Sequence, residues 1–272
     1  MTLGRLEKLK VVFQLDTERL PKATQTRGGK LVKVAPVLTA DGLSGSQVFQ
    51  CVLDVMKRLD MAAEFTLHGE PISLQRLQEK IEASPIWPNG IVSNRLSLQF
   101  GLVTSWKQSF LLVEELESGV AKAWSDWVEP FLGKAEFVQA WISDKDYDYW
   151  QNAKDPKVFE SAGREYAHLP MKSNGLPPPL TQNVIDTSGN PGRWSLKSGY
   201  IEAVGSAMWL GEPFWRLVGD TRRAELLSAD WLEVGSAAAG VLFVKSAKHA
   251  FCEHSSDQTQ DQLRAILYGP KA

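Results

Sequence analysis

The chain is poor in the residues that build disulfide-rich folds and in the apolar runs that cross membranes. Its 272 residues include two cysteines, Cys51 and Cys252, which is too few for a disulfide framework. No apolar stretch approaches the roughly 18 residues that a transmembrane helix needs. The first fifteen residues interrupt their apolar side chains with charges, unlike a secretory signal. We therefore expect a protein that stays in the cytoplasm and has no membrane partner.

The common motifs of nucleotide-binding enzymes and of serine hydrolases are missing as well. Gly28-Gly29-Lys30 lacks the earlier Gly and the following Ser or Thr of a phosphate-binding loop. The nearest approach to a G-x-S-x-G elbow, at 42–45, is better explained as the start of a helix. The net charge of −2 argues against a broad attraction to nucleic acid. These absences predict a chain that is not an enzyme, needs no cofactor and does not bind nucleic acid directly.

Patterns typical of strands and of helices alternate irregularly along the chain. Leu96, Leu98 and Phe100 alternate with polar residues, which predicts a half-buried strand with 108–113 as its hairpin partner. Apolar residues at helical spacing predict a helix over 48–59. Because no regular strand–helix–strand period occurs, the pattern favours an α+β fold with a mixed, mainly antiparallel sheet and packed helices.

The segment 171–193 is the clearest irregular stretch, with four Pro and three Gly. A long segment without predicted structure is usually functional or mobile, and the alternative is a linker between two lobes. We expect a single α+β domain over residues 1–272, with 171–193 as the lobe boundary if the chain has two lobes.

The middle of the chain carries an excess of acid. Residues 114–170 hold twelve Asp or Glu against six Lys or Arg, whereas residues 1–33 hold eight Lys or Arg against three Asp or Glu. These could be solvated faces that cancel, or the middle could present a negative surface to a cationic partner. Its 144–151 region predicts a short helix that Ser143 caps, in which aromatic residues stand beside carboxylates, as suits a protein interface. The candidate partner-binding residues are Asp144, Asp146, Tyr147, Asp148, Tyr149 and Trp150.

The same segment raises the alternative of a metal-dependent hydrolase that uses Asp144–Lys157. The D-x-D-x-D run suits Ca²⁺ or Mg²⁺, but Tyr149 stands where an EF-hand needs Gly. On a helix, positions 144 and 148 also share a face while 146 lies opposite. Asp155-Pro156-Lys157 superficially matches the D-x-K of metal-dependent nucleases, yet Pro156 does not suit a core strand. We predict no metal site here.

A second metal hypothesis concerns the end of the chain. His249, Cys252 and His254 could supply three zinc ligands, but structural zinc sites usually have four, in paired units. The alternative is a helix or loop with ordinary polar residues, and again we predict no metal.

Three segments resemble a known family: Phe137–Trp150 (FVQAWISDKDYDYW), Gly199–Gly211 (GYIEAVGSAMWLG) and the stretch from Ala229 onward (ADWLEVGSAAAGVLFVKSA). They are similar to immunity proteins of bacterial polymorphic-toxin and type VI secretion systems, of the class paired with restriction-endonuclease-fold toxins. The resemblance covers residues 95–272. It implies a cytoplasmic protein that is not an enzyme. Such a protein binds a cognate toxin effector, a nuclease, and occludes its active site or blocks its assembly. The family offers no contact residues to carry over. A third hypothesis is a scaffold or chaperone that loads a secreted effector.

Overall fold

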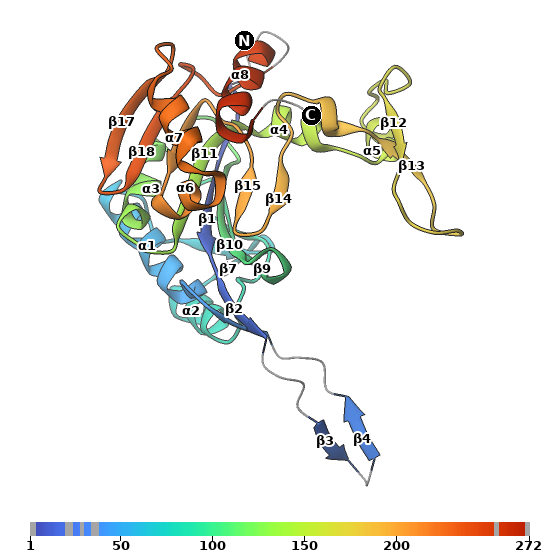
Figure 1. Cartoon of the computed structure of the whole chain (residues 1–272). Helices are drawn as coiled ribbons and strands as arrows, with labels where there is room; N and C mark the ends of the chain where they lie inside the picture. Colours follow the sequence, from blue (N-terminus) through green and yellow to red (C-terminus); the bar gives the residue numbers. More distant parts are fainter. Residues whose placement is uncertain (1–3, 20–23, 28–29, 34–37, 253–255, 270–272) are drawn as a thin grey trace.

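The centre of the molecule is one sheet of ten strands in which every pair of neighbours is antiparallel (Figure 1). The structure is a computed structural model and describes residues 4–19, 24–27, 30–33, 38–252 and 256–269. The predicted α+β fold with a mainly antiparallel sheet is confirmed. In spatial order the strands are β17 (Glu233–Ala238), β18 (Val241–Lys245), β16 (Ala207–Leu210), β11 (Phe137–Asp144), β1 (Glu7–Gln14), β10 (Gln108–Glu115), β9 (Leu96–Val103), β8 (Ile91–Ser93), β6 (Phe65–Leu67) and β7 (Glu70–Ile72).

The strand β1 lies inside this sheet and divides its two apolar cores. Successive residues of a strand point to opposite faces. Leu9, Val11 and Phe13 accordingly join one buried cluster, and Val12 joins the other. The predicted hairpin of β9 and β10 is present, and β10 pairs with β1 in turn. The two cores therefore belong to one continuous sheet.

Three helices cover the first face: α1 (Gly45–Arg58), α2 (Leu74–Glu82) and α3 (Trp124–Leu132). The helix α1 begins with a capping box, in which the Gln47 N–H donates to Ser44 Oγ at 3.2 Å and the Ser44 N–H donates to Gln47 Oε1 at 2.9 Å. Its predicted apolar stripe is buried against the sheet. This face is filled with apolar side chains, which makes it the larger core.

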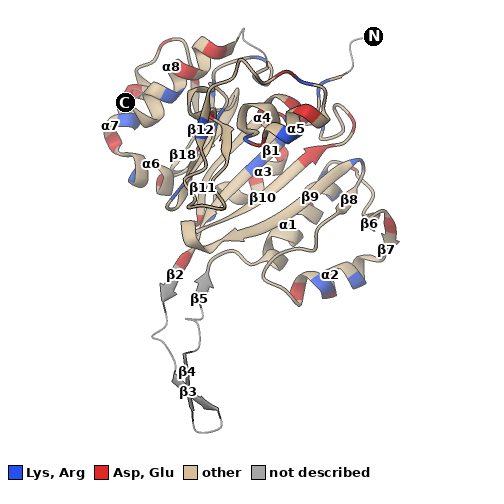
Figure 2. Cartoon of the chain, turned by 90° about the vertical axis from the view of Figure 1, so that its right-hand side faces the viewer, with Lys and Arg blue, Asp and Glu red and all other residues tan. Residues whose placement is uncertain are grey.

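The second face is covered over only part of its width. The helices α6 (Glu212–Val218), α7 (Asp220–Leu227) and α8 (Asp257–Tyr268) pack on the half of the sheet that β11, β16 and β18 form. A hairpin of β14 (Ser195–Lys197) and β15 (Tyr200–Glu202) crosses the end of β1 and β11, where Gln139 Nε2 donates to the Ile201 carbonyl at 2.9 Å. Figure 2 shows that β10, β9 and β8 turn their second face toward the viewer without a helix in front of it.

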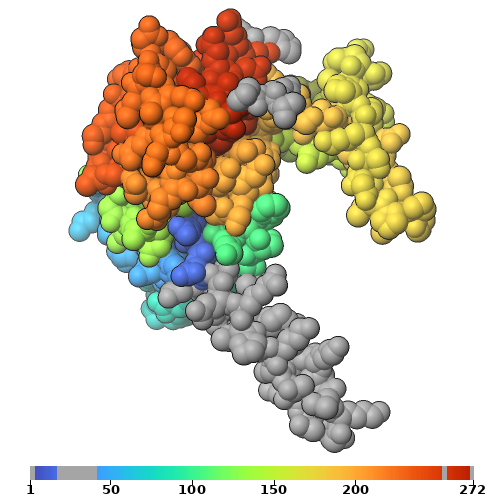
Figure 3. All heavy atoms as spheres, in the orientation of Figure 1, coloured from blue at the N-terminus to red at the C-terminus, as the bar shows by residue number. Residues whose placement is uncertain are grey.

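The segment 171–193 contains more structure than the sequence predicts. It folds into a hairpin of β12 (Met171–Ser173) and β13 (Asn183–Ile185) and a short 3₁₀ turn, η2 (Thr187–Gly189). The hairpin stands out from the body of the molecule (Figures 1 and 3). The strand β11, which precedes the segment, pairs with β16, which follows it after the β14–β15 hairpin, in the same sheet.

Four further strands lie between β1 and α1 and form two antiparallel pairs. The strand β2 (Asp16–Arg19) pairs with β5 (Leu38–Asp41), and β3 (Thr24–Arg27) pairs with β4 (Lys30–Lys33). The sequence predicts a polar loop or arm here, over 19–33, and part of that range lies outside the described residues.

The two edges of the ten-stranded sheet differ in how they end. At one edge, β7 has three residues with Pro71 in the middle. At the other, β17 carries a register shift between Ser236 and Ala238, which is a β-bulge against β18. Neither edge strand was predicted from the sequence.

Candidate functional site

The helix α4 (Lys145–Asn152) carries most of the predicted partner-binding residues and follows β11 directly. The Asp144 carboxylate accepts the Tyr147 N–H at 2.8 Å and caps the helix. The predicted cap, Ser143, is wrong because β11 continues through Ser143 and pairs it with Lys8. Asp144 is 7% exposed. Its carboxylate therefore stabilises the start of α4.

Asp148 lies one turn further on, on the same inner side of α4. Its carboxylate is 2.6 Å from the Lys8 ammonium, and Lys8 also lies 3.9 Å from Glu114 on β10. Lys145 reaches Glu114 from the other side, at 3.9 Å. Two cations and two anions thus form one neutral network between α4, β1 and β10. Asp148 is 8% exposed, so its charge is already paired inside the protein.

Tyr147 connects α4 to the last helix. Its hydroxyl accepts a hydrogen bond from Gln260 Nε2 of α8 at 2.8 Å. Burial of the ring raises the pKa of Tyr147 to about 12. The phenol is therefore neutral at physiological pH and acts as a fixed hydrogen-bonding group.

The loop 190–194 is held tightly against α4. Asn190 Nδ2 donates to the Gln151 carbonyl at 2.8 Å, and the Trp194 N–H donates to Asn152 Oδ1 at 2.8 Å. A Cβ at Gly192 would lie 2.7 Å from both Gln151 Cγ and Tyr147 Cε1. A larger residue at position 192 would therefore force the loop away from the helix and move Trp194 with it.

The outer side of α4 presents aromatic and charged groups to solvent. Trp150 Nε1 donates to Asp146 at 2.9 Å, and the Arg164 guanidinium lies 4.2 Å from the centre of the Trp150 ring. This stacking is a cation–π contact. Tyr149 meets Trp150 edge to face at 5.0 Å and is 50% exposed. Phe159, on α5 (Pro156–Ser161), packs edge to face against Trp150, with the two ring centres 4.9 Å apart.

A cavity of about 470 Å³ opens beside Trp150. Apolar side chains of Phe159, Leu169 and Ile185 line it together with Arg164 and Asp186. A hydrogen bond from Lys172 at 2.7 Å, together with the Ser188 N–H, holds the pKa of Asp186 well below its ordinary value. The cavity therefore joins the outer side of α4 to the β12–β13 hairpin.

That hairpin exposes large apolar side chains. Met171, Leu176 and Leu180 are 43%, 50% and 60% exposed. The Ile185 N–H donates to the Lys154 carbonyl at 2.9 Å, which fixes the base of the hairpin next to α4. We call Asp146, Tyr149 and Trp150 together with Met171, Leu176 and Leu180 the α4–hairpin surface. Sequence reasoning missed the hairpin part of it. Three apolar residues within a Pro- and Gly-rich stretch were the available signal.

The structure thus divides the six predicted partner-binding residues into two groups. Asp146, Tyr149 and Trp150 lie together on the outer side of α4, whereas Asp144 and Asp148 are buried and bonded within the protein. Tyr147 is half-buried between the groups. Contact with a partner stays a prediction for this set, and the geometry favours the outer three.

The carboxylates of the hydrolase hypothesis do not converge in this structure. Asp155 caps α5, where it accepts the Lys157 N–H at 2.9 Å, so the D-x-K sequence forms a helix start. In the described part of the chain, no group of three or more His, Cys, Asp or Glu side chains is placed to hold a metal ion. His254, one of the three hypothetical zinc ligands, lies outside the described residues.

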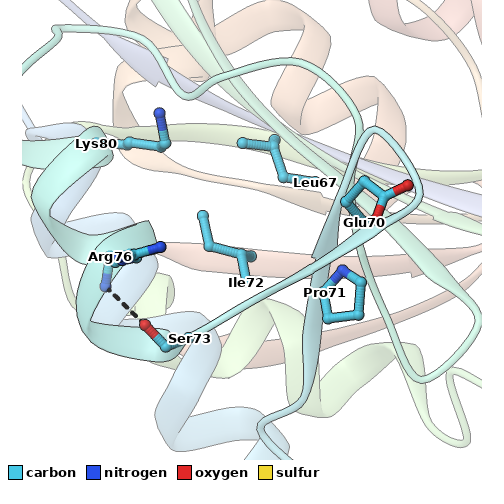
Figure 4. A pocket seen from close by; sticks show the side chains of 7 residues that line it. All are labelled: Leu67, Glu70, Pro71, Ile72, Ser73, Arg76 and Lys80. Carbon is cyan, nitrogen blue, oxygen red and sulfur yellow. Dashed lines mark hydrogen bonds between the residues drawn. The ribbon is translucent and has the colours of Figure 1, made fainter.

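A second cavity, of about 410 Å³, lies at the far end of the sheet (Figure 4). Leu67 and Ile72 form its apolar floor, and Arg76 and Lys80 of α2 stand at its rim. The Arg76 N–H donates to Ser73 Oγ, which caps α2. Both cations are exposed. Three strands, β10, β9 and β8, separate β1 from β6, which carries Leu67, so this cavity is independent of the α4–hairpin surface.

Comparison with known proteins gives little further guidance. No protein-family model and no curated protein match the chain. The chain is similar in structure to the Pseudomonas aeruginosa T6SS protein PA0821, with a TM-score of 0.46 and 11% sequence identity, over 98% of this chain and 73% of that one. At this TM-score the likeness fixes neither family nor function. Among the described residues, no helix is long and apolar enough to cross a membrane.

Proposed function

We propose that this protein is an immunity protein that binds and neutralises a cognate toxin, a nuclease that acts in the cytoplasm, as part of a type VI secretion effector–immunity pair. The observation that carries the proposal is the α4–hairpin surface. Its hairpin exposes Leu176 and Leu180 at 50% and 60%, and the base of the hairpin is hydrogen-bonded to the chain just after α4 through Ile185 and Lys154. Large apolar side chains gathered on a projecting element and rimmed by polar groups mark protein interaction sites.

The sequence resemblance supports the proposal in a second way. Its three segments correspond to β11 with α4, to β15 with β16, and to β17, β18 and α8. The strands β11, β16, β18 and β17 are consecutive neighbours in the sheet. The resembling residues therefore belong to one half of the molecule, and that half carries the outer side of α4.

The test is binding to the protein encoded beside this gene. We expect the purified pair to form a stable complex, and we expect co-expression to protect cells from the toxin. Absence of both binding and protection would overturn the proposal. Nuclease activity measured in the complex separates neutralisation from the alternative of an effector-loading scaffold, because a scaffold would leave the toxin active.

A matched pair of variants locates the contact. Leu180→Asp places a charge on the hairpin and should weaken binding at least tenfold, because an unpaired charge in an interface is costly to desolvate. Leu227→Asp is the control, since Leu227 is 57% exposed on α7, away from the hairpin. Both variants should fold like the wild type. Equal losses of affinity, or none in either, would remove the hairpin from the interface.

A further inference from the structure

Lys10 lies two residues after Lys8 on the same face of β1. Its neighbours Leu9 and Val11 point into the core under α1 and α3. Across the sheet, Lys10 stands opposite Leu112 of β10 and Trp141 of β11. Its side chain therefore rises from the second face, between the part that the C-terminal helices cover and the part that stays open.

Three aromatic rings from three different elements surround the Lys10 ammonium. Its Nζ is 5.0 Å from the ring centre of Trp194, 5.3 Å from that of Phe110 and 5.9 Å from that of Trp141. Trp194 belongs to the loop that Asn152 and Gly192 hold against α4. The electron-rich faces of such rings attract a cation.

The Lys10 charge has no counter-ion within the described part of the chain. Lys8, Lys145, Glu114 and Asp148 pair with one another, whereas no carboxylate of the residues that the structure describes lies within 4.0 Å of Lys10 Nζ. Burial, and then repulsion from Lys8, lowers the pKa of Lys10 to about 8, against the opposing effects of Asp148 and Glu114. A recessed cation without a partner is costly to keep. Such a cost is typical of functional sites.

The surroundings of Lys10 remain accessible. Lys10, Phe110 and Leu112 are all partly exposed. Figure 2 shows no helix in front of β10, the strand that carries Phe110 and Leu112. Figure 3 shows a gap between the body and the β12–β13 hairpin. The site thus opens onto a broad surface, which suits a protein side chain.

We propose that Lys10 and its ring of Phe110, Trp141 and Trp194 form a socket for a carboxylate side chain, Asp or Glu, of the partner protein. This inference rests on the proposed function. It adds that the partner brings an acidic residue to the open sheet face. The ion pair forms in a recessed, aromatic-lined place, where truncation of one member typically weakens a complex strongly.

The first experiment measures affinity for the neighbouring gene's product by calorimetry. Lys10→Met keeps the length of the side chain and removes its charge, and we expect binding to weaken roughly 30-fold or more. Lys10→Arg should retain more affinity than Lys10→Met because it keeps the charge. Lys80→Met, at the exposed cation of α2, should bind like the wild type. If the wild type binds and Lys10→Met binds equally well, this inference fails while the proposed function stands. If the wild type does not bind, both fail.

The second experiment needs no substitution and follows the Lys10 amine by NMR in the wild-type protein. A partner carboxylate should raise its pKa from about 8 toward the ordinary 10.5 when the complex forms. An unchanged pKa in the complex overturns the inference. Acetate in large molar excess is the probe for small anions. If acetate alone raises the pKa as much as the partner does, the socket binds free carboxylates and the proposed partner contact is wrong.

Discussion

Around β1, the two faces of the sheet are built from different side chains. On the first face, Leu9, Val11 and Phe13 are fully buried under helices. On the second, Lys8 and Lys10 stand among aromatic rings and carboxylates, and part of the face has no cover. The covered face contributes apolar burial, which stabilises the fold. The other face holds the paired charges of Lys8, Glu114 and Asp148 and, beside them, Lys10, which we propose as a socket for a partner carboxylate. Stability and binding should therefore respond separately to changes on the two faces.

The largest effect on stability is expected on the covered face. Phe13 is fully buried, and its ring meets Phe131 of α3 edge to face at 5.1 Å. Phe13→Ala should lower the free energy of unfolding by about 3–5 kcal/mol, through lost burial and a residual cavity. Urea denaturation measures this change. The folded fraction of this variant should still bind the partner with unchanged affinity. If the folded fraction binds more weakly, the covered face also affects binding, and the two faces do not act separately.

A smaller effect is expected at the buried end of α4. Asp148→Ala removes the partner of Lys8 and should destabilise the protein by about 2 kcal/mol, because Glu114 still lies near the remaining cation. The matched control is Asp146→Ala, on the exposed side, which should change the unfolding free energy by less than about 1 kcal/mol. If the two variants have the same free energy of unfolding, the buried Asp148 contributes no more to stability than the exposed Asp146 does.

Removal of the Lys10 charge should stabilise the protein, whereas Phe13→Ala and Asp148→Ala should destabilise it. The pKa of Lys10 is lower in the folded protein than in the unfolded chain, so between about pH 8 and pH 10.5 the unfolded state binds more protons. Wild-type stability should therefore rise through this window, and Lys10→Met should lack that rise. At pH 7 the variant should be more stable by roughly 1–2 kcal/mol, after allowance for partial exposure. Urea unfolding of both proteins near pH 7 and pH 9.5 tests this. A variant that is less stable at both pH values would mean that the cation–π contacts dominate.

The smallest effect on stability is expected at Asp146. Asp146→Lys should lower the unfolding free energy by about 1 kcal/mol, because it loses contacts with Trp150 and Arg164 and places a cation in the first turn of α4. If the outer side of α4 steers a cationic region of the partner, association should slow at low salt and recover at high salt. Asp54→Lys, on the exposed side of α1, is the control. Equal kinetics for the two variants at low salt would exclude steering by Asp146.

Parts of this architecture could be predicted from sequence because their signals are local. The alternation in β9 and β10 and the apolar stripe of α1 determine those elements. The strand β17, with the sequence EVGSAA, has low strand propensity and forms because β18 pairs with it. The short helices α6 and α7 likewise depend on packing against the sheet.

The candidate site was predictable only in part, for the same reason. Helical geometry places 144 and 148 together and 146 opposite, as the structure has them. Which side faces inward depends on Lys8, which lies far away in the sequence and reaches Asp148 only through strand pairing. The same distance conceals the rings around Lys10, because no local pattern links β1 to Trp194.

The two edges of the ten-stranded sheet have a consequence for assembly. An unprotected edge strand invites another strand to continue the sheet, and repeated addition ends in aggregates. Pro71 has no N–H to offer an incoming strand at β7, and the bulge at Ser236 bends β17 out of a straight template. Both ends thus discourage strand-by-strand polymerisation of the chain, and they leave the open sheet face and the projecting hairpin as the surfaces on which the proposed partner contacts can be tested.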